Sequence, residues 1–451
     1  MAVNSKVKKL LGQRAIVIGS SIAGMLSARV LTDYFERVTI LDRDVLPTTP
    51  QARRGVPQSV QPHVLLTKGY RLITEFFPGI DSQLEAHGVL NIDWAQEFQY
   101  YVEGSWSSST EEASDLVSVT CSRYLLEWII RQELLKLPNV EIKSQSKVAG
   151  LIYNAEAKKI TGVMLYSDEQ LSGDLIVDAS GRSSKASQWL KAIGATAAPE
   201  TVVNPQLGYA TRRYQLPADL KPDWKVLLIS QTPPKDTRLG YLARIENNEL
   251  IATLGGYGGD YPPLDDRGFL EFAQSLAQPD FYRAIANAIP TSPIYAHRAT
   301  TNRRRDYDQI ELPAGFIALG DAVCALCPVY GQGMSVSALA AKTLQAWLSK
   351  SSPEKFDNNR FQKQLAKSNS FHWTIATSQD SRFPSTIGGQ QKEPGIFGKL
   401  MTGYMSRLVK VSATEPNLRL MFIEISHLLR SPLYLYHPAV IWQVLTSKAT
   451  V

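Results

Sequence analysis

The feature that most constrains the fold is a glycine-bearing turn near the start of the chain. An apolar, β-branched run, Ala15–Ile18, meets Gly19, and a helical pattern from Ile22 to Tyr34 follows at once. A second β-branched run, Val38–Asp42, comes next. This order of short run, glycine, helix and second run is typical of a βαβ unit, whose crossover helix covers a parallel sheet. The sequence therefore predicts an α/β domain with a doubly wound sheet.

The turn reads Gly19-Ser-Ser-Ile-Ala-Gly24. Its first glycine allows a tight turn, and its last lets the helix pack closely on the strand. The helix N-terminus then offers free N–H groups and a positive dipole end to a pyrophosphate. Asp42 follows the second run and is placed to accept a hydrogen bond from a ribose hydroxyl. Ser21 replaces the usual middle glycine, and plain α/β domains contain similar turns, so this motif indicates a dinucleotide site without establishing it.

A second turn, Asp178-Ala-Ser-Gly-Arg-Ser-Ser184, ends another buried run. A glycine-bearing turn at a strand end lets the backbone approach a dinucleotide. A generic strand-end turn explains this segment equally well.

A third turn is more specific. Gly320-Asp321 ends the run Phe316–Leu319, and Pro328-Val-Tyr-Gly-Gln-Gly333-Met334 then leads into a small-residue helix, Ser335–Leu344. A strand-end carboxylate can accept from the hydroxyls of a ribityl chain. A glycine-rich loop that opens a helix places N–H groups against the pyrimidine edge of a flavin, where negative charge develops on reduction. The three turns in this order predict an FAD site.

The three motifs resemble the GxGxxG, DG and GD fingerprints of class A FAD-dependent monooxygenases, across roughly residues 13–350. Within that class they are most similar to polyether-type polyketide epoxidases. The similar segments are Arg54–Gln58 with His63, Ser122–Glu127, Tyr209–Arg212, Thr301–Arg304 with Tyr307 and Asp308, and Gly320–Gly331.

The resemblance implies a reaction and its partners. A flavin C4a-hydroperoxide would epoxidise or hydroxylate a lipophilic alkene, polyene or aromatic secondary metabolite, with molecular oxygen as co-substrate. It also implies that Arg123 contacts the FAD and that the Val56–His63 loop lies beside the isoalloxazine. The candidate cofactor-binding residues are Gly19, Ser21, Ile22, Ala23, Gly24, Asp42, Arg43, Arg54, Val56, Arg123, Val148, Asp178, Gly181, Gly320, Asp321, Pro328, Gly331, Gly333 and Met334.

His63 is the candidate catalytic residue, because it could orient a substrate or the flavin hydroperoxide. A histidine in a packed loop is more often simply hydrogen-bonded. No metal site is predicted: the histidines show no metal spacing, and Cys324-x-x-Cys327 lacks a second ligand pair. We therefore interpret these two cysteines as small core residues.

The electron donor is left open by a departure from the family. Ser180 stands where the DG motif has an aspartate, which in the family is associated with the use of the reductant. Either NAD(P)H or a separate flavin reductase is expected. The chain has no second glycine-rich βαβ unit, so Arg303–Arg305 are candidate phosphate contacts for a transiently docked NAD(P)H. Pairing of these arginines with Asp306 and Asp308 is the other interpretation.

Two alternative functions stay open. The form Asp178–Gly181 also resembles geranylgeranyl reductases, which keeps a flavin-dependent isoprenoid double-bond reductase or cyclase among the candidates. A non-catalytic flavin-binding protein is the second. A flavin halogenase is disfavoured because the chain has no Gly-Trp-x-Trp-x-Ile-Pro segment.

The element pattern predicts a Rossmann-like FAD-binding domain interleaved with an antiparallel substrate domain, followed by a helical C-terminal region. Residues Gln379–Pro394, polar and rich in Gly and Pro, are predicted to form a loop. The predicted boundaries are 1–78, 111–195 and 298–350 for the FAD-binding domain, 79–110 and 196–297 for the substrate domain, and 351–451 for the helical region.

Composition excludes several classes. The 48 basic and 42 acidic residues nearly cancel and form no long basic stripe, so nucleic acid is not an expected partner. Three cysteines provide no disulfide framework and suggest a reducing, cytoplasmic compartment. The uncharged stretch Ala322–Ala341 is broken by proline and glycines, so it predicts no transmembrane helix. We predict that Trp373, Tyr404, Phe422 and Trp442 lie on core helix faces, with membrane contact at most peripheral.

Overall fold

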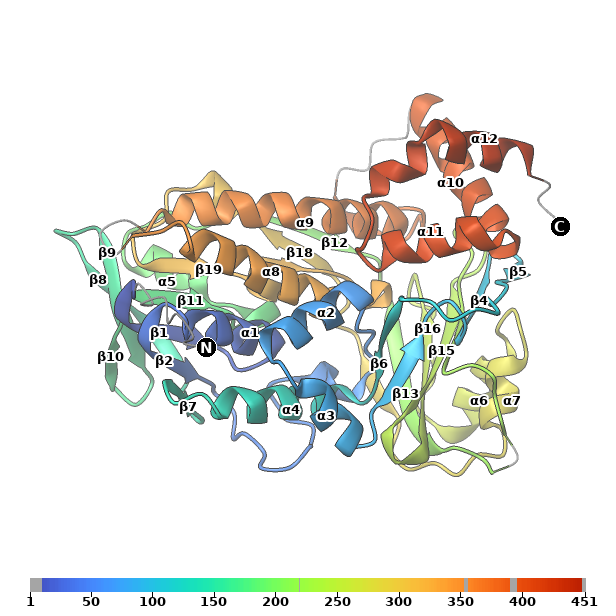
Figure 1. Ribbon diagram of the computed structural model, residues 1–451, viewed down its shortest axis with the longest axis horizontal. Coiled ribbons are helices and arrows are strands. Elements are labelled where there is room, and N and C mark those ends of the chain that lie inside the picture. The colour runs from blue at the N-terminus through green and yellow to red at the C-terminus, as the bar shows by residue number, and fades with distance from the viewer. Residues whose placement is uncertain (1–9, 219, 353–355, 390–395, 448–451) are drawn as a thin grey trace, which may run out of the picture.

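The computed structural model describes residues 10–218, 220–352, 356–389 and 396–447. A parallel sheet and its helices form one end of the molecule, and a large antiparallel sheet forms the other (Figure 1). The last helices form a lobe beside the antiparallel sheet (Figure 1). This is the α/β architecture that the sequence predicts.

The parallel sheet carries the three turns. Its strand order is β19-β11-β1-β2-β7, and every neighbouring pair is parallel. Its central strands are buried on both faces and consist largely of apolar residues, whereas the edge strand β7 is partly exposed. The bounds are β1 Gly12–Ile18, β2 Phe35–Leu41, β7 Val140–Lys143, β11 Leu175–Asp178 and β19 Phe316–Ala318.

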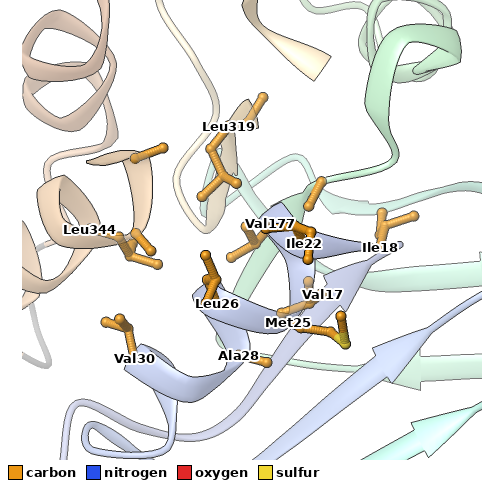
Figure 2. Close-up of a cluster of buried hydrophobic side chains, with 14 of the residues drawn as sticks. Val17, Ile18, Ile22, Met25, Leu26, Ala28, Val30, Val177, Leu319 and Leu344 are labelled. Atoms are coloured by element: carbon orange, nitrogen blue, oxygen red, sulfur yellow. The ribbon is translucent and has the colours of Figure 1, made fainter. Parts of the chain in front are cut away.

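The core of this domain lies between the sheet and two helices, α1 (Ile22–Leu31) and α8 (Gly333–Leu348). Figure 2 shows Val17, Leu26 and Leu344 approaching one another from β1, α1 and α8. All three side chains are fully buried. Packing of α1 on α8 brings the first turn and the third turn, more than 300 residues apart, to the same side of the sheet.

A seven-stranded sheet forms the other end, in the order β17-β13-β16-β15-β14-β4-β5. Its pairs are antiparallel as predicted, except that β4, from the earlier segment at 98–102, runs parallel to β14. The bounds are β4 Phe98–Val102, β5 Ser105–Trp106, β13 Gly208–Gln215, β14 Val226–Ile229, β15 Arg238–Ile245, β16 Glu249–Gly256 and β17 Tyr295–His297.

Two helices that the sequence analysis did not predict cover this sheet: α6 (Asp266–Gln274) and α7 (Asp280–Ile285). Asp265 caps α6 by accepting from the Gly268 amide. Phe269 and Phe281 bury the apolar faces of the two helices against the strands. Both helices are short, and short apolar runs do not distinguish helix from strand by periodicity.

Three smaller sheets complete the fold, and the one formed by β8, β9 and β10 lies at the outer edge of the parallel-sheet end (Figure 1). They have the orders β10-β9-β8, β20-β18-β12-β21 and β3-β6. Their strands are β3 Leu90–Asp93, β6 Val117–Thr120, β8 Val148–Asn154, β9 Lys159–Leu165, β10 Gln170–Ser172, β12 Glu200–Asn204, β18 Asn302–Arg305, β20 Cys324–Ala325 and β21 Ile387–Gly388.

The predicted loop at Gln379–Pro394 needs correction. Helix α9 (Asn358–Asp380) includes its first two residues, and Ile387–Gly388 pairs with β12. Asp380 is buried and accepts hydrogen bonds inside the protein, so a polar residue ends a helix here instead of starting a loop. Residues 390–394 lie outside the described part of the chain.

The C-terminal region is helical, as predicted. Leu408, Leu418 and Val444 join its helices in a small apolar core. The side chain of Trp442, in contrast, is 71% exposed, so its predicted core position is wrong. Its helix buries Val440 and Val444, and a residue two positions after the first lies on another face. In the described residues, no helix is long and apolar enough to cross a membrane.

The remaining helices are α2 Thr67–Phe76, α3 Ile80–Ala86, α4 Arg123–Leu135, α5 Ala186–Ala192, α10 Ile396–Thr414, α11 Pro416–Ser426 and α12 Pro438–Thr446.

Candidate cofactor site and catalytic cavity

The first turn has the geometry that its glycines predict. Gly19 has a φ of +103°, which glycine adopts without strain. A Cβ on Gly24 would lie 1.9 Å from the Gly19 carbonyl oxygen, so helix and strand approach too closely for any side chain. Asp42 accepts from the Ser20 amide at 2.8 Å and from the Ser20 hydroxyl at 2.5 Å. The carboxylate at the end of β2 thus fixes the turn.

A buried ion network lies beside this turn. Arg53 pairs with Glu127 at 2.7 Å, Asp44 at 2.8 Å and Asp42 at 3.1 Å. Arg123 pairs with Glu127 at 2.9 Å and donates to the Ser21 hydroxyl at 2.9 Å. Burial alone would raise the pKa of Glu127, but the two arginines hold it below its usual value. The network therefore stays charged and holds the loop at Arg53 against the first turn.

The arginine proposed for this region from sequence was Arg54, whose side chain is exposed. Arg53, its neighbour, makes the network and lines the cavity described below. Two adjacent arginines cannot be distinguished by composition, and only the path of the loop decides which one points inward. Arg53 is a residue that the sequence reasoning missed.

The second turn is held by Asp178. Its carboxylate accepts from the amide and hydroxyl of Ser180, at 3.0 and 2.5 Å, and from the Ser184 hydroxyl at 2.5 Å. Burial raises the pKa of Asp178, and these hydrogen bonds oppose the shift. Gly181 has a φ of +81°. Ser180 is thus a structural partner of Asp178 in this turn.

The third turn presents an unpaired carboxylate. Asp321 lines the cavity, and the described residues give its side chain no hydrogen-bond or ion-pair partner. Burial raises its pKa, while Arg182 and Arg123 oppose that shift. The backbone of Gly320, with a φ of +61°, lies so close to α1 that a Cβ would meet the Ala23 methyl at 2.7 Å. A partnerless acceptor at a strand end fits a ligand that brings hydroxyl groups.

The loop that opens α8 is bare toward the cavity. Gly331 adopts the left-handed region, with a φ of +63°. A Cβ on Gly333, the first residue of α8, would meet no atom within 4 Å. Gly333 lines the cavity, so the N-terminus of α8, with its first unpaired N–H groups, lies at the cavity wall.

The same loop is held from behind by Asp380. The Tyr330 hydroxyl donates to its carboxylate at 2.6 Å, and the Asn302 amide donates at 2.5 Å. Asn302 also accepts from the Cys327 amide at 2.7 Å. Burial raises the pKa of Asp380 to about 6, and the hydrogen bonds oppose this. None of these contacts carries a sequence signal, because Asp380 belongs to no motif.

All three turns open into one cavity of about 2610 Å³. Pockets for a single drug-sized ligand usually measure about 300–1,000 Å³, so this one has room for a dinucleotide and a second ligand. Most predicted cofactor residues line it. Those that do so are Gly19, Ser21, Ile22, Ala23, Asp42, Arg43, Val56, Arg123, Val148, Gly181, Asp321, Pro328, Gly331, Gly333 and Met334.

Four predicted residues do not line the cavity: Gly24, Arg54, Asp178 and Gly320. Gly24 and Gly320 pack backbone closely behind it, and Asp178 fixes the second turn. These three shape the cavity wall from behind, whereas Arg54 lies on the surface.

Comparison with known proteins identifies a relative. No protein-family model matches the chain. Protein Rv3254 of Mycobacterium tuberculosis (strain ATCC 25618 / H37Rv) is 31% identical over 346 residues, covering 73% of this chain and 72% of that protein. The chain belongs to the Rv3254 family.

Solved structures share the fold of this Rv3254 family member. The flavin-dependent brominase Bmp2 has a TM-score of 0.67 at 15% identity and covers 96% of this chain and 98% of its own. PqsL of Pseudomonas aeruginosa, described as a probable FAD-dependent monooxygenase, has a TM-score of 0.60 at 14% identity, covering 82% and 94%. The flavin-dependent halogenase CmlS has a TM-score of 0.62 at 14% identity, covering 91% and 77%. The fold is that of FAD-dependent monooxygenases and halogenases.

His63, the candidate catalytic residue, lines the cavity. Its Nδ1 lies 3.0 Å from the Gln61 carbonyl oxygen. Burial, with help from Arg123, lowers its pKa to about 3. The imidazole is therefore neutral at physiological pH and can orient a ligand by hydrogen bonding, but it holds no acidic proton to give.

The remaining sequence predictions concern the two cysteines, the three consecutive arginines and metal binding. Cys324 and Cys327 are free and buried, as expected for core residues. Arg304 pairs with Asp306 at 2.7 Å, whereas Arg303 and Arg305 pair with Glu200 and not with Asp308. In the part of the chain that is described, no group of three His, Cys, Asp or Glu side chains could hold a metal ion.

Proposed function

We propose that this Rv3254 family member binds FAD without a covalent bond and acts as a monooxygenase on a lipophilic substrate. The observation that carries the proposal is the partnerless Asp321 carboxylate, which shares one cavity with the bare N-terminus of α8 and with the first turn. An acceptor for ribityl hydroxyls, N–H groups for the flavin edge and a pyrophosphate turn suit the three parts of one FAD molecule. The fold shared with FAD-dependent proteins supports this choice.

Bound FAD would supply the chemistry of oxygen activation, and the chain would supply position and surroundings. Asp321 would hold the ribityl chain, and the N–H groups at Gly333 would stabilise negative charge at the pyrimidine edge. His63, with Nδ1 bound to the Gln61 carbonyl, would keep Nε2 as an acceptor for a substrate hydroxyl. The buried walls would exclude water from the reacting atoms.

The substrate class follows from the far wall of the cavity. Trp94, Phe98, Tyr241, Phe422 and Ile423 line it, from the antiparallel sheet, the segment before β4 and helix α11. Such a wall favours an apolar ligand, because its burial contributes about 25 cal/mol per Å² of apolar surface. Epoxidation or hydroxylation of an alkene, polyene or aromatic compound is the proposed reaction.

The proposed electron donor is a separate flavin reductase, with slow direct reduction by NAD(P)H. Ser180 carries no charge and its hydroxyl is committed to Asp178. Arg303 and Arg304 line the cavity, but each is already paired with a carboxylate. Anaerobic stopped-flow at the flavin absorbance band measures this directly. Fast, saturable bleaching by NADPH alone would contradict the proposal for the donor.

One purification and one turnover experiment test the function. The protein should be yellow, and heat should release a cofactor that runs as FAD; recovery of NAD alone would overturn the cofactor assignment. Turnover with ¹⁸O₂ should place labelled oxygen in the product of a lipophilic alkene or phenol. Reduction or cyclisation without label would indicate the isoprenoid enzyme instead, and slow flavin oxidation unchanged by every substrate would indicate a binding protein.

A further inference from the structure

A buried arginine without a counterion lies in the far wall of the cavity. Arg419, in the first half of α11, is 4% exposed and lines the cavity. Its Nη2 donates to the Phe98 carbonyl at 2.9 Å. Its Nε has no hydrogen-bond partner, and the described residues offer its guanidinium no ion pair. The side chain brings a positive charge into the protein and leaves it uncompensated.

Three acids lie near Arg419 in the chain or beside Phe98, and none forms an ion pair with it. Glu97, beside Phe98, pairs with Lys225 at 2.7 Å. Glu424, one turn further along α11, pairs with Arg430 at 2.6 Å. Glu415 lies four residues before Arg419 on the same side of the helix but forms no ion pair with it. None of these three carboxylates pairs with Arg419.

The surroundings make the isolated charge unfavourable. Burial lowers the pKa of Arg419 to about 10, with no charged group contributing, so the side chain is still protonated at neutral pH. Its position in the N-terminal half of α11 adds the positive end of the helix dipole. Trp94, Phe98 and Ile423 supply an apolar setting. An unpaired charge in such a place is unfavourable unless a partner of opposite charge binds.

Arg123, another buried arginine that lines the cavity, differs from Arg419 in having a carboxylate partner. Arg123 is equally buried, at 4% exposed, and pairs with Glu127. Arg53 next to it has three carboxylate partners. Carboxylates thus neutralise Arg53 and Arg123 beside the first turn, whereas Arg419 pairs with no carboxylate of the described residues.

We propose that Arg419 binds an anionic group, a carboxylate, at one end of an otherwise apolar substrate. This deepens the proposed function by naming the substrate class: a lipophilic acid whose body lies along the aromatic wall while its carboxylate pairs with the guanidinium. An arginine fork suits a carboxylate because it can donate two parallel hydrogen bonds. Such an anchor would fix which part of an apolar chain reaches the flavin.

Equilibrium binding tests this without any turnover. Oleate below its micelle concentration and methyl oleate below its solubility limit are titrated into the FAD-loaded protein, and quenching of tryptophan fluorescence is followed. Wild type should bind oleate at least about tenfold more tightly than the ester. Arg419→Met, which keeps the apolar stem, should remove that preference and leave the affinity for the ester within about twofold.

Two further variants keep the result interpretable. Arg419→Lys should retain part of the preference, because it keeps the charge and loses the fork. Arg430→Met is the matched control, since Arg430 lies on the same lobe, is paired with Glu424 and does not line the cavity; it should leave both affinities unchanged. Equal binding of acid and ester by wild type, or an equal loss of both in Arg419→Met, would overturn the inference.

The oxygen-incorporation and binding measurements together separate the proposed monooxygenase activity from the proposed anion site at Arg419. A charge preference that depends on Arg419 without oxygen incorporation would keep the anion site and reject the monooxygenase. Incorporation of oxygen with no effect of Arg419 on binding would keep the enzyme and reject the anion site.

Discussion

Two buried arginines that line the same cavity, Arg123 and Arg419, differ in their partners. Beside the first turn, Arg53 and Arg123 share Glu127, and Asp42 and Asp44 complete a closed network. At the C-terminal lobe, Arg419 has one backbone carbonyl and no carboxylate. The difference teaches that buried charges serve two purposes in one protein. The ion network around Glu127 holds the backbone of the first turn in place. The unpaired guanidinium of Arg419, in contrast, is itself the group that we propose to bind a ligand.

The largest effect is expected where the closed network is broken. Glu127→Gln would leave two buried guanidinium groups without their common partner, which should destabilise the protein by about 3–5 kcal/mol. Urea unfolding measures the loss. Glu249→Gln is the control, because Glu249 pairs with the part-exposed Arg213, and the change should cost about 1 kcal/mol or less. Similar values for the two variants would contradict the closed-network interpretation.

Glu127 also predicts an acid limit to stability. Its folded pKa lies below its unfolded value, which is about 4.3, so its contribution is complete above that pH and is lost as the pH falls through the folded pKa. Wild type should lose stability in this acid range more steeply than Glu127→Gln. Parallel stability curves from pH 6 to pH 3 would show that Glu127 does not titrate with folding.

A side chain at Gly333, the first residue of α8, should weaken FAD binding strongly without unfolding the protein. The Cβ of Gly333→Val meets no protein atom, so Tm should change little, but the new side chain occupies the space in front of the helix N–H groups. We expect FAD affinity to fall by more than about tenfold, measured by FAD content and absorbance after gel filtration. Wild-type FAD content would show that the flavin edge does not lie here.

Removal of the Asp321 carboxylate should have a smaller effect on the same measurement. Asp321→Ala would leave a ligand hydroxyl unpaired in a largely dry site, at a cost of about 1–3 kcal/mol of FAD affinity. Asp266→Ala, at an exposed pair with Arg212, is the control and should bind FAD normally. If both variants keep wild-type affinity, the third turn is not the ribityl site.

The smallest effect is expected on the exposed face of the lobe that holds Arg419. Trp442→Ser replaces a side chain that is 71% exposed and should change the free energy of unfolding by about 0.5 kcal/mol or less. A loss of 2 kcal/mol or more, on the order of a core truncation, would show that Trp442 is covered in solution.

The residues of the three turns could be predicted from the sequence, whereas the residues that hold these turns in place from other parts of the chain could not. Gly19, Asp321 and Gly333 are readable because each sits at a junction of strand, turn and helix, where local geometry permits few residues. Arg53, Asp380 and Arg419 are not, because their roles come from contacts such as Arg53–Glu127 and Asn302–Asp380, 74 and 78 positions apart, or from the absence of a partner. The short helices α6 and α7 were missed for a related reason, since six to nine residues hold too few turns to show a period.

The hydrogen bond between Tyr330 and Asp380 has a consequence for folding during synthesis, because Tyr330 is made before Asp380. Every sequence motif for the cofactor lies before residue 335, yet the loop at Pro328–Gly331 is fastened by a carboxylate that leaves the ribosome some fifty residues later. A nascent chain ending at residue 350 would contain all three signatures and would still lack the group that holds the last one in place. The loop can therefore gain this support only once α9 has been synthesised to its last residue, Asp380.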